Sequence, residues 1–126
     1  MTEPAGRIGA YQPLRIKQGS DYLEEFEFRD SITNALVDFT GYTAVAQLRK
    51  YAKSPIKTAD FVCTFPSAGI LRVQLSGSIT EAIACGELLG DSQSQYEWDC
   101  EFVVPGGVVE PALYGEVEVF REVTRT

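Results

Sequence analysis

The longest alternation of hydrophobic and polar residues in the chain covers positions 96–104. Apolar side chains occupy every second position there, and carboxylates stand between them. The apolar set is Tyr96, Trp98, Cys100 and Phe102, and the acidic set is Glu97, Asp99 and Glu101. Since neighbouring side chains of a strand lie on opposite faces, the pattern predicts a β-strand with one buried face and one acidic face. Trp98 is the only tryptophan, and we expect it at the centre of the core.

Shorter alternations with the same period of two are separated by turn-forming residues. They cover residues 14–17, 22–28, 43–50, 58–65, 70–75 and 113–123, with brief strands at 35–37 and 108–109. The short turn at 66–69 predicts an antiparallel hairpin. The whole pattern predicts an all-β fold: a single antiparallel, immunoglobulin-like β-sandwich of seven or eight strands.

One short helix is also expected, within residues 76–86. Ser78 can cap its N-terminus, and Glu81 follows three residues later, as in a capping box. Gly86 can end it, which leaves about two turns across one end of the sandwich.

The length of 126 residues suits one domain. Residues 1–13 are rich in proline and glycine and predict an extended N-terminal arm, with the sandwich domain over 14–126. Ile8 and Tyr11 are apolar groups on this arm, and we interpret them as interaction residues. We expect the arm to be mobile in the isolated chain and ordered against a neighbouring protein, because it offers little apolar surface to offset its backbone entropy.

The predicted structural core consists of residues on the apolar faces of the strands. They are Phe26, Phe28, Leu48, Phe61, Leu71, Val73, Tyr96, Trp98, Cys100, Phe102, Val117 and Val119.

The net charge of -7 argues against nucleic acid or an anionic membrane as the main partner. No run approaches the roughly 18 apolar residues of a membrane helix. The first residues lack the apolar segment of a secretory signal, so we expect the chain to fold in a cytoplasm.

Candidate chemistry is sparse. Histidine is absent, no G-x-S-x-G or phosphate-loop motif occurs, and the three cysteines, Cys63, Cys85 and Cys100, form no C-x-x-C pair. We therefore expect free thiols, no metal, no cofactor and no enzymatic activity. The acidic face of residues 97–101 suits a metal or catalytic site, but carboxylates on a strand are usually solvated. The basic residues around 49–57 suit either a phosphate site or, as we expect, a solvated loop.

Four short motifs in order resemble the small β-sandwich virion proteins of tailed bacteriophages. They are the strand and QGSD turn at 14–22, DFTGY with its following strand at 38–44, QLRK at 47–50 and GEVEV at 115–119. The arrangement is similar to the N-terminal module of phage upper baseplate proteins and to fibre-associated tail proteins. Phe39 stands where leucine is commoner in that pattern. No catalytic residue carries over with it.

The resemblance implies a structural component of a virion made in a bacterial cytoplasm, at the baseplate or where a fibre attaches, with head decoration as a variant. Its partners would be other virion proteins and further copies of itself. The alternative is a carbohydrate- or receptor-binding module that uses exposed tyrosines. Candidates are Tyr11, Tyr42, Tyr51, Tyr96 and Tyr114. A coplanar pair of exposed rings would favour that alternative.

The cysteine pattern makes a testable prediction. Thiol titration should find three reactive groups in denaturant and fewer in the native protein, because buried thiols are inert. A disulfide or stoichiometric zinc would contradict this expectation.

Overall fold

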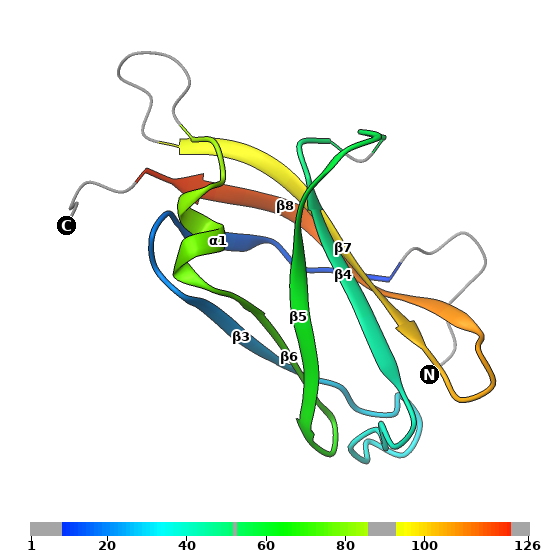
Figure 1. Ribbon diagram of the computed structural model, residues 1–126. Coiled ribbons are helices and arrows are strands. Elements are labelled where there is room, and N and C mark those ends of the chain that lie inside the picture. The colour runs from blue at the N-terminus through cyan, green and yellow to red at the C-terminus, as the bar shows by residue number, and fades with distance from the viewer. Residues whose placement is uncertain (1–8, 52, 86–92, 122–126) are drawn as a thin grey trace.

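The computed structural model describes residues 9–51, 53–85 and 93–121, without the side chains of Gln93 and Ser94. Within these residues the chain forms eight strands and one short helix (Figure 1). In order they are β1 (Ala10–Tyr11), β2 (Leu14–Lys17), β3 (Tyr22–Glu27), β4 (Thr43–Arg49), β5 (Lys57–Ser67), β6 (Ile70–Leu75), α1 (Gly77–Glu81), β7 (Gln93–Val103) and β8 (Val109–Phe120).

The strands form two sheets that share one strand. The first sheet has the order β2-β8-β7-β4-β5, with β1 also beside β8, and the second has the order β5-β6-β3. All pairs are antiparallel except those of β1 and β2, which run parallel to β8. The predicted all-β, immunoglobulin-like sandwich is confirmed by this arrangement.

Strand β5 joins the sheets because it changes partner halfway along its length. Ala59 and Phe61 lie opposite Leu48 and Ala46 of β4, whereas from Val62 onward the strand pairs with β6. In Figure 1 β5 lies beside β4 at its upper end and turns into β6 at its lower end. The sequence indicates one strand here, but its two partners follow from the tertiary structure.

Alternation along the strands builds the core. Of the residues predicted to lie there, all are buried except Phe26 and Phe28, which are partly buried against the others. Phe39 and Leu14 are also buried but were not predicted, because one lies in a connection and the other in a four-residue strand.

Trp98 lies in the middle of this core and is 3% exposed. Its ring is stacked near Phe26, at 6.2 Å between centroids, and is tilted against Phe61 at 5.6 Å. A buried indole N–H requires an acceptor, and here it donates to the backbone carbonyl of Gln12 over 2.7 Å.

This hydrogen bond ties the N-terminal strands to the core. Residues 10–12, which the sequence assigns to the arm, lie along β8, and the Gln12 N–H donates to the Tyr114 carbonyl. A Cβ on Gly115 would lie 2.6 Å from the Gln12 oxygen, so only glycine leaves room for that carbonyl to reach Trp98. The glycine of the GEVEV motif therefore has a packing role.

The helix is shorter than predicted and has a different cap. Ser76, rather than Ser78, caps α1 and accepts a hydrogen bond from the Ile79 N–H. Thr80 is fully buried, and its hydroxyl donates to the Ser20 carbonyl of the β2–β3 turn. Contact with that turn sets where the helix begins, which local sequence does not reveal.

Two strand boundaries also differ from the predictions. The brief strand expected at 35–37 is only an isolated bridge between Arg29 and Leu36. The turn expected at 66–69 is shorter, because β5 continues through Pro66 to Ser67 with an irregular register. Proline is tolerated in a strand at such an irregularity.

The three cysteines are free thiols, with Cys100 buried and the other two partly buried. A hydrogen bond with Cys63 and burial both raise the pKa of the Cys100 thiol. Cys100 should therefore be the least reactive of the three.

The Trp98–Gln12 hydrogen bond can be tested with a double-mutant cycle. Gly115→Ala should destabilise the protein by about 1–3 kcal/mol through overpacking, and Trp98→Phe by about 1–3 kcal/mol through an unpaired carbonyl. Because both changes break one interaction, the double variant should lose less than their sum in urea denaturation. Val62→Thr, on the other sheet, should combine additively with Gly115→Ala. Additivity within the first pair would contradict the coupling.

Candidate interaction surface

The β3–β4 connection is held in shape by its own polar groups. The Asp30 carboxylate accepts hydrogen bonds from the backbone N–H groups of Thr33 and Ile32, and these lower its pKa. Asn34 has a φ of 62°, a conformation that asparagine tolerates better than most residues. Its carbonyl accepts from Arg29, whose Nε also binds Glu27 at 2.9 Å. These hydrogen bonds therefore hold the first half of the connection in one conformation.

The DFTGY motif forms the second half of this connection. Asp38 accepts from the backbone N–H and the hydroxyl of Thr40, and a turn closes from the Tyr42 N–H to the Phe39 carbonyl. Gly41 has a φ of 81°, and a Cβ there would lie 3.0 Å from Pro105 of the β7–β8 hairpin. The turn thus brings the connection against the hairpin.

Phe39 anchors the turn in an aromatic cluster. Its ring centroid lies 4.5 Å from that of Phe65, 5.2 Å from that of Phe102 and 5.7 Å from that of Phe28. The sequence signal for this anchor is an aromatic residue between Asp38 and Gly41, where turns usually carry polar residues.

The β7–β8 hairpin faces the connection because of a bulge. The register shifts between Cys100 and Glu101, so that Leu113 lies opposite the first and Pro111 opposite the second. Ala112 and Leu113 are consequently both buried although they are adjacent. Bulges bend a strand and re-aim its side chains, and here Glu110 lies on the side of Phe102.

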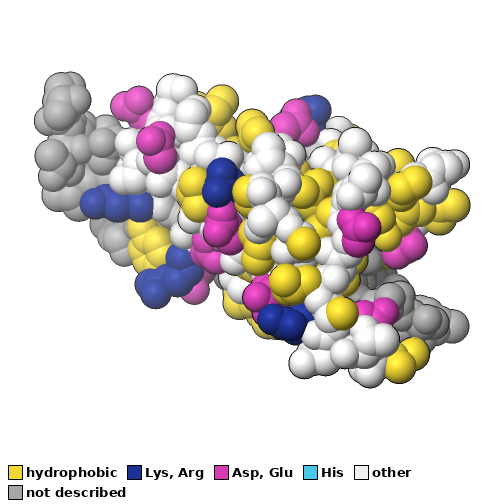
Figure 2. Space-filling model, turned by 90° about the horizontal axis from the view of Figure 1, so that it is seen from below, with side chains coloured by type: hydrophobic (Ala, Val, Ile, Leu, Met, Phe, Trp, Pro, Cys, Tyr) yellow, Lys and Arg dark blue, Asp and Glu magenta, His cyan; other side chains and the backbone are white. Residues whose placement is uncertain are grey.

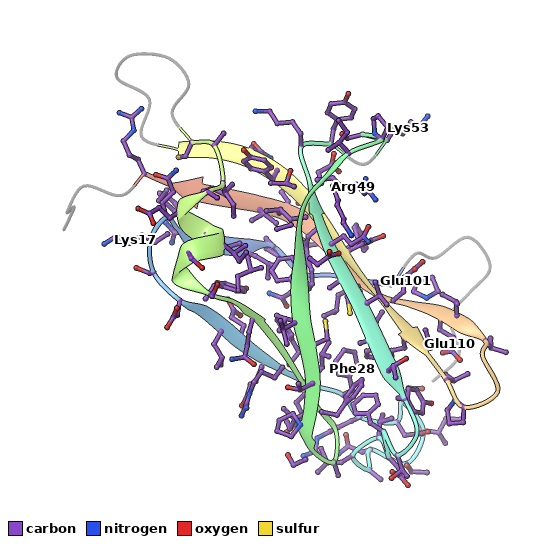
Figure 3. The ribbon with its side chains drawn as sticks, in the orientation of Figure 1. Lys17, Phe28, Arg49, Lys53, Glu101 and Glu110 are labelled. Carbon is purple, nitrogen blue, oxygen red and sulfur yellow. The ribbon has the colours of Figure 1, made fainter. Side chains whose placement is uncertain are left out.

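An open groove of about 350 Å³ separates the connection from the hairpin. Aromatic and aliphatic side chains line it, with Arg29 and Glu110 as its charged groups. Figure 3 shows Phe28 and Glu110 on the two elements that flank it. Concave apolar sites with a few polar groups are the usual shape of binding sites.

Exposed hydrophobic side chains also lie on the two elements that flank the groove, and one of them, Val109, lines it. Ile32 is 92% exposed and Leu36 42% in the connection, while Val108 and Val109 are 60% and 54% exposed on the hairpin. Figure 2 looks onto this end and shows hydrophobic side chains interspersed with charged and other polar groups. We call these four residues and the groove the loop-end surface.

Of the two interaction residues predicted on the arm, only Tyr11 lies within the described residues, and it is not on this surface. Ile8 is outside the described residues. Tyr11 is exposed on the outer face of the first sheet, where its ring meets Tyr114 edge-on and its hydroxyl binds Glu116. That hydrogen bond lowers the pKa of Glu116 and raises that of Tyr11.

Most of the charged groups predicted to be solvated are exposed, but Arg49 is half-buried and hydrogen-bonded. Glu97, Asp99 and Glu101 are exposed on the outer face of β7. Among the basic residues, Lys57 pairs with Asp60 at 2.7 Å. The described part of the chain holds no cluster of three or more potential metal ligands. None of its helices has the length and apolar character that crossing a membrane requires.

No protein-family model and no curated protein matches the sequence. Solved structures to which the chain shows some similarity include an IG1–IG1 heterodimer of ZIG-8 and RIG-5 (10% identity, 91% of this chain and 89% of that chain covered, TM-score 0.36). Murine CRIg has 11% identity, with 87% of this chain and 92% of that chain covered and a TM-score of 0.40. The extracellular domain of the voltage-gated sodium channel beta4 subunit has 9% identity, with 96% and 100% covered and a TM-score of 0.38. The strand order of the chain itself defines its fold.

The Asp30 turn makes a local prediction. Asp30→Ala should speed amide hydrogen exchange at Ile32 and Thr33 at neutral pH and leave β7 unchanged, as measured by NMR. In the wild type, the pKa of Asp30 is lowered, so its carboxylate is ionised and stabilises the turn at every pH above the ordinary Asp pKa near 3.8. That stabilisation should disappear as the pH falls through the lowered pKa. Equal protection in both proteins would show that the rest of the connection holds the turn.

Proposed function

We propose that this protein is a non-enzymatic structural component of a larger particle and acts by protein–protein contact through the loop-end surface. The observation that carries the proposal is the apolar groove, which Val109 lines, together with the exposed side chains of Ile32, Leu36 and Val108 on the two elements that flank it. Contiguous exposed apolar surface costs solubility, and in soluble proteins it marks contact sites.

The rigidity of the loop-end surface supports a role in protein–protein contact. The hydrogen bonds of Asp30 and Asp38 and the anchoring of Phe39 already fix the connection in the free protein. A preformed surface loses little conformational entropy on binding, so more of the apolar burial contributes to affinity. Repeated assembly contacts benefit from such rigidity.

We extend the proposal to the virion of a tailed bacteriophage, at the baseplate or a fibre attachment point, with head decoration as a variant. The support is the ordered set of sequence motifs that resembles small virion proteins. In this chain those motifs have scaffold roles: Gly19 turns the chain with a φ of 80°, and Gly115 admits the Gln12 carbonyl. Other virion proteins and further copies of the chain are the proposed partners.

A matched pair of substitutions tests the proposal. Val108 on the loop-end surface and Val62 on the outer face of the second sheet are each 60% exposed. Val108→Glu and Val62→Glu should therefore both fold, with stability changes of about 0.5 kcal/mol or less. A phage lacking the gene is complemented with each variant, and occupancy in purified particles is measured by quantitative mass spectrometry.

We expect Val108→Glu to lower occupancy at least about tenfold, because a carboxylate would be buried in an apolar contact, and Val62→Glu to leave it near the wild-type level. Absence of the wild-type protein from particles would overturn the virion role. Normal occupancy of Val108→Glu would overturn the assignment of the loop-end surface while leaving the virion role intact.

A further inference from the structure

A second concave site lies on the outer face of the first sheet, away from the loop end. It is an open cleft of about 170 Å³ between strands β4, β7 and β8. Figure 3 places Arg49 far from Phe28 and Glu110 of the loop-end surface. The cleft is lined by Gln47, Arg49, Glu97, Asp99 and Tyr114, with Trp98 and Gly115 completing it.

Strand register sets the geometry of the cleft. Gln47 lies opposite Asp99, and Asp99 lies opposite Tyr114, so one row across three strands carries an amide, a carboxylate and a phenol ring. In the next row Arg49 lies opposite Glu97. Side chains on adjacent strands of a rigid sheet are held more precisely than side chains on loops.

Arg49 is fixed in place at one side of the cleft. One guanidinium nitrogen donates to Gln47 Oε1 over 2.8 Å, and another donates to the Ser54 carbonyl over 2.8 Å. Asp99 is partly desolvated, which raises the pKa of its carboxyl, while the positive charge of Arg49 opposes that shift. A donor and an acceptor thus stand side by side before any ligand binds.

The charges of the cleft define the ligand it suits. Arg49 offers hydrogen-bond donors, and the carboxylates of Asp99 and Glu97 offer acceptors. A neutral molecule with neighbouring hydroxyl groups satisfies both kinds of group, because each hydroxyl can donate to a carboxylate and accept from a guanidinium. The ring of Tyr114 adds an apolar surface for carbon-bound hydrogens.

The aromatic geometry limits the size of this ligand. The rings of Tyr11 and Tyr114 lie 5.7 Å apart at an interplanar angle of 64°, so they form no flat surface along which a polysaccharide chain could stack. A single ring beside a small cleft suits one sugar unit.

We propose that this cleft binds a neutral saccharide unit through Arg49 and Asp99, with Tyr114 packing against its apolar side. The site is independent of the loop-end surface, so a particle component with this cleft would contact surface glycans as well as its protein neighbours. Failure of either proposal leaves the other standing.

The intrinsic fluorescence of Trp98 provides the test, because the only tryptophan of the chain adjoins the cleft. The complete protein is titrated with D-glucose, D-galactose and N-acetyl-D-glucosamine separately, with NMR titration as a second readout. At least one sugar should give a saturable change. Asp99→Asn and Arg49→Gln should each weaken that binding about tenfold or more, as expected for loss of a charge-assisted hydrogen bond.

Glu101→Gln is the matched control, because Glu101 lies on the same face of β7 but outside the cleft. It should change the dissociation constant by less than about twofold, in the range of ordinary surface substitutions. Lack of a saturable response to all three sugars would overturn the proposal, and so would equal weakening by Glu101→Gln. Saturable binding of methylammonium or acetate at the same residues would assign the cleft to a charged ligand instead.

Discussion

The hydrogen bond from the Trp98 indole to the Gln12 carbonyl is the interaction on which the rest of the structure depends. Burying a large ring stabilises the core only if its N–H finds a partner, and no side chain supplies one here. The acceptor comes from the kink between β1 and β2, and Gly115 leaves the space that it needs. One constraint therefore fixes the N-terminal strands, the edge of the first sheet and the burial of Leu14 and Ile16.

At the loop end, the buried ring of Phe39 plays a similar part, because it anchors the long β3–β4 connection. Phe39 contacts Phe28 of the connection itself, Phe65 of β5 and Phe102 of β7, so the cluster joins the connection to both sheets. The polar groups of Asp30 and Asp38 then satisfy the backbone of the exposed segments. Apolar side chains of the connection and the hairpin that do not reach the core, such as Ile32 and Val108, remain exposed.

The two proposed surfaces differ in chemistry because they arise from different parts of the fold. The loop-end surface is made by connections that carry apolar residues past the ends of the strands. The cleft around Arg49 is made by the outward positions of central strands, which are mostly polar because they face water. A sandwich can carry both surfaces, because the residues on its faces and at its ends can change without changing the residues of its core.

By itself, the sequence determined the features that depend on neighbours along the chain. Period-two alternation is a local property, so it located β2, β3, β4, β6 and β7 and most of the core. The sheet exchange of β5 and the parallel attachment of residues 10–12 were not predictable, because each depends on a partner distant in sequence. The groove and the cleft also depend on residues that are distant in sequence, so they were not predictable either. Alternation showed that Glu97 and Asp99 face away from Trp98, but only the register of three strands placed Arg49 and Tyr114 beside them.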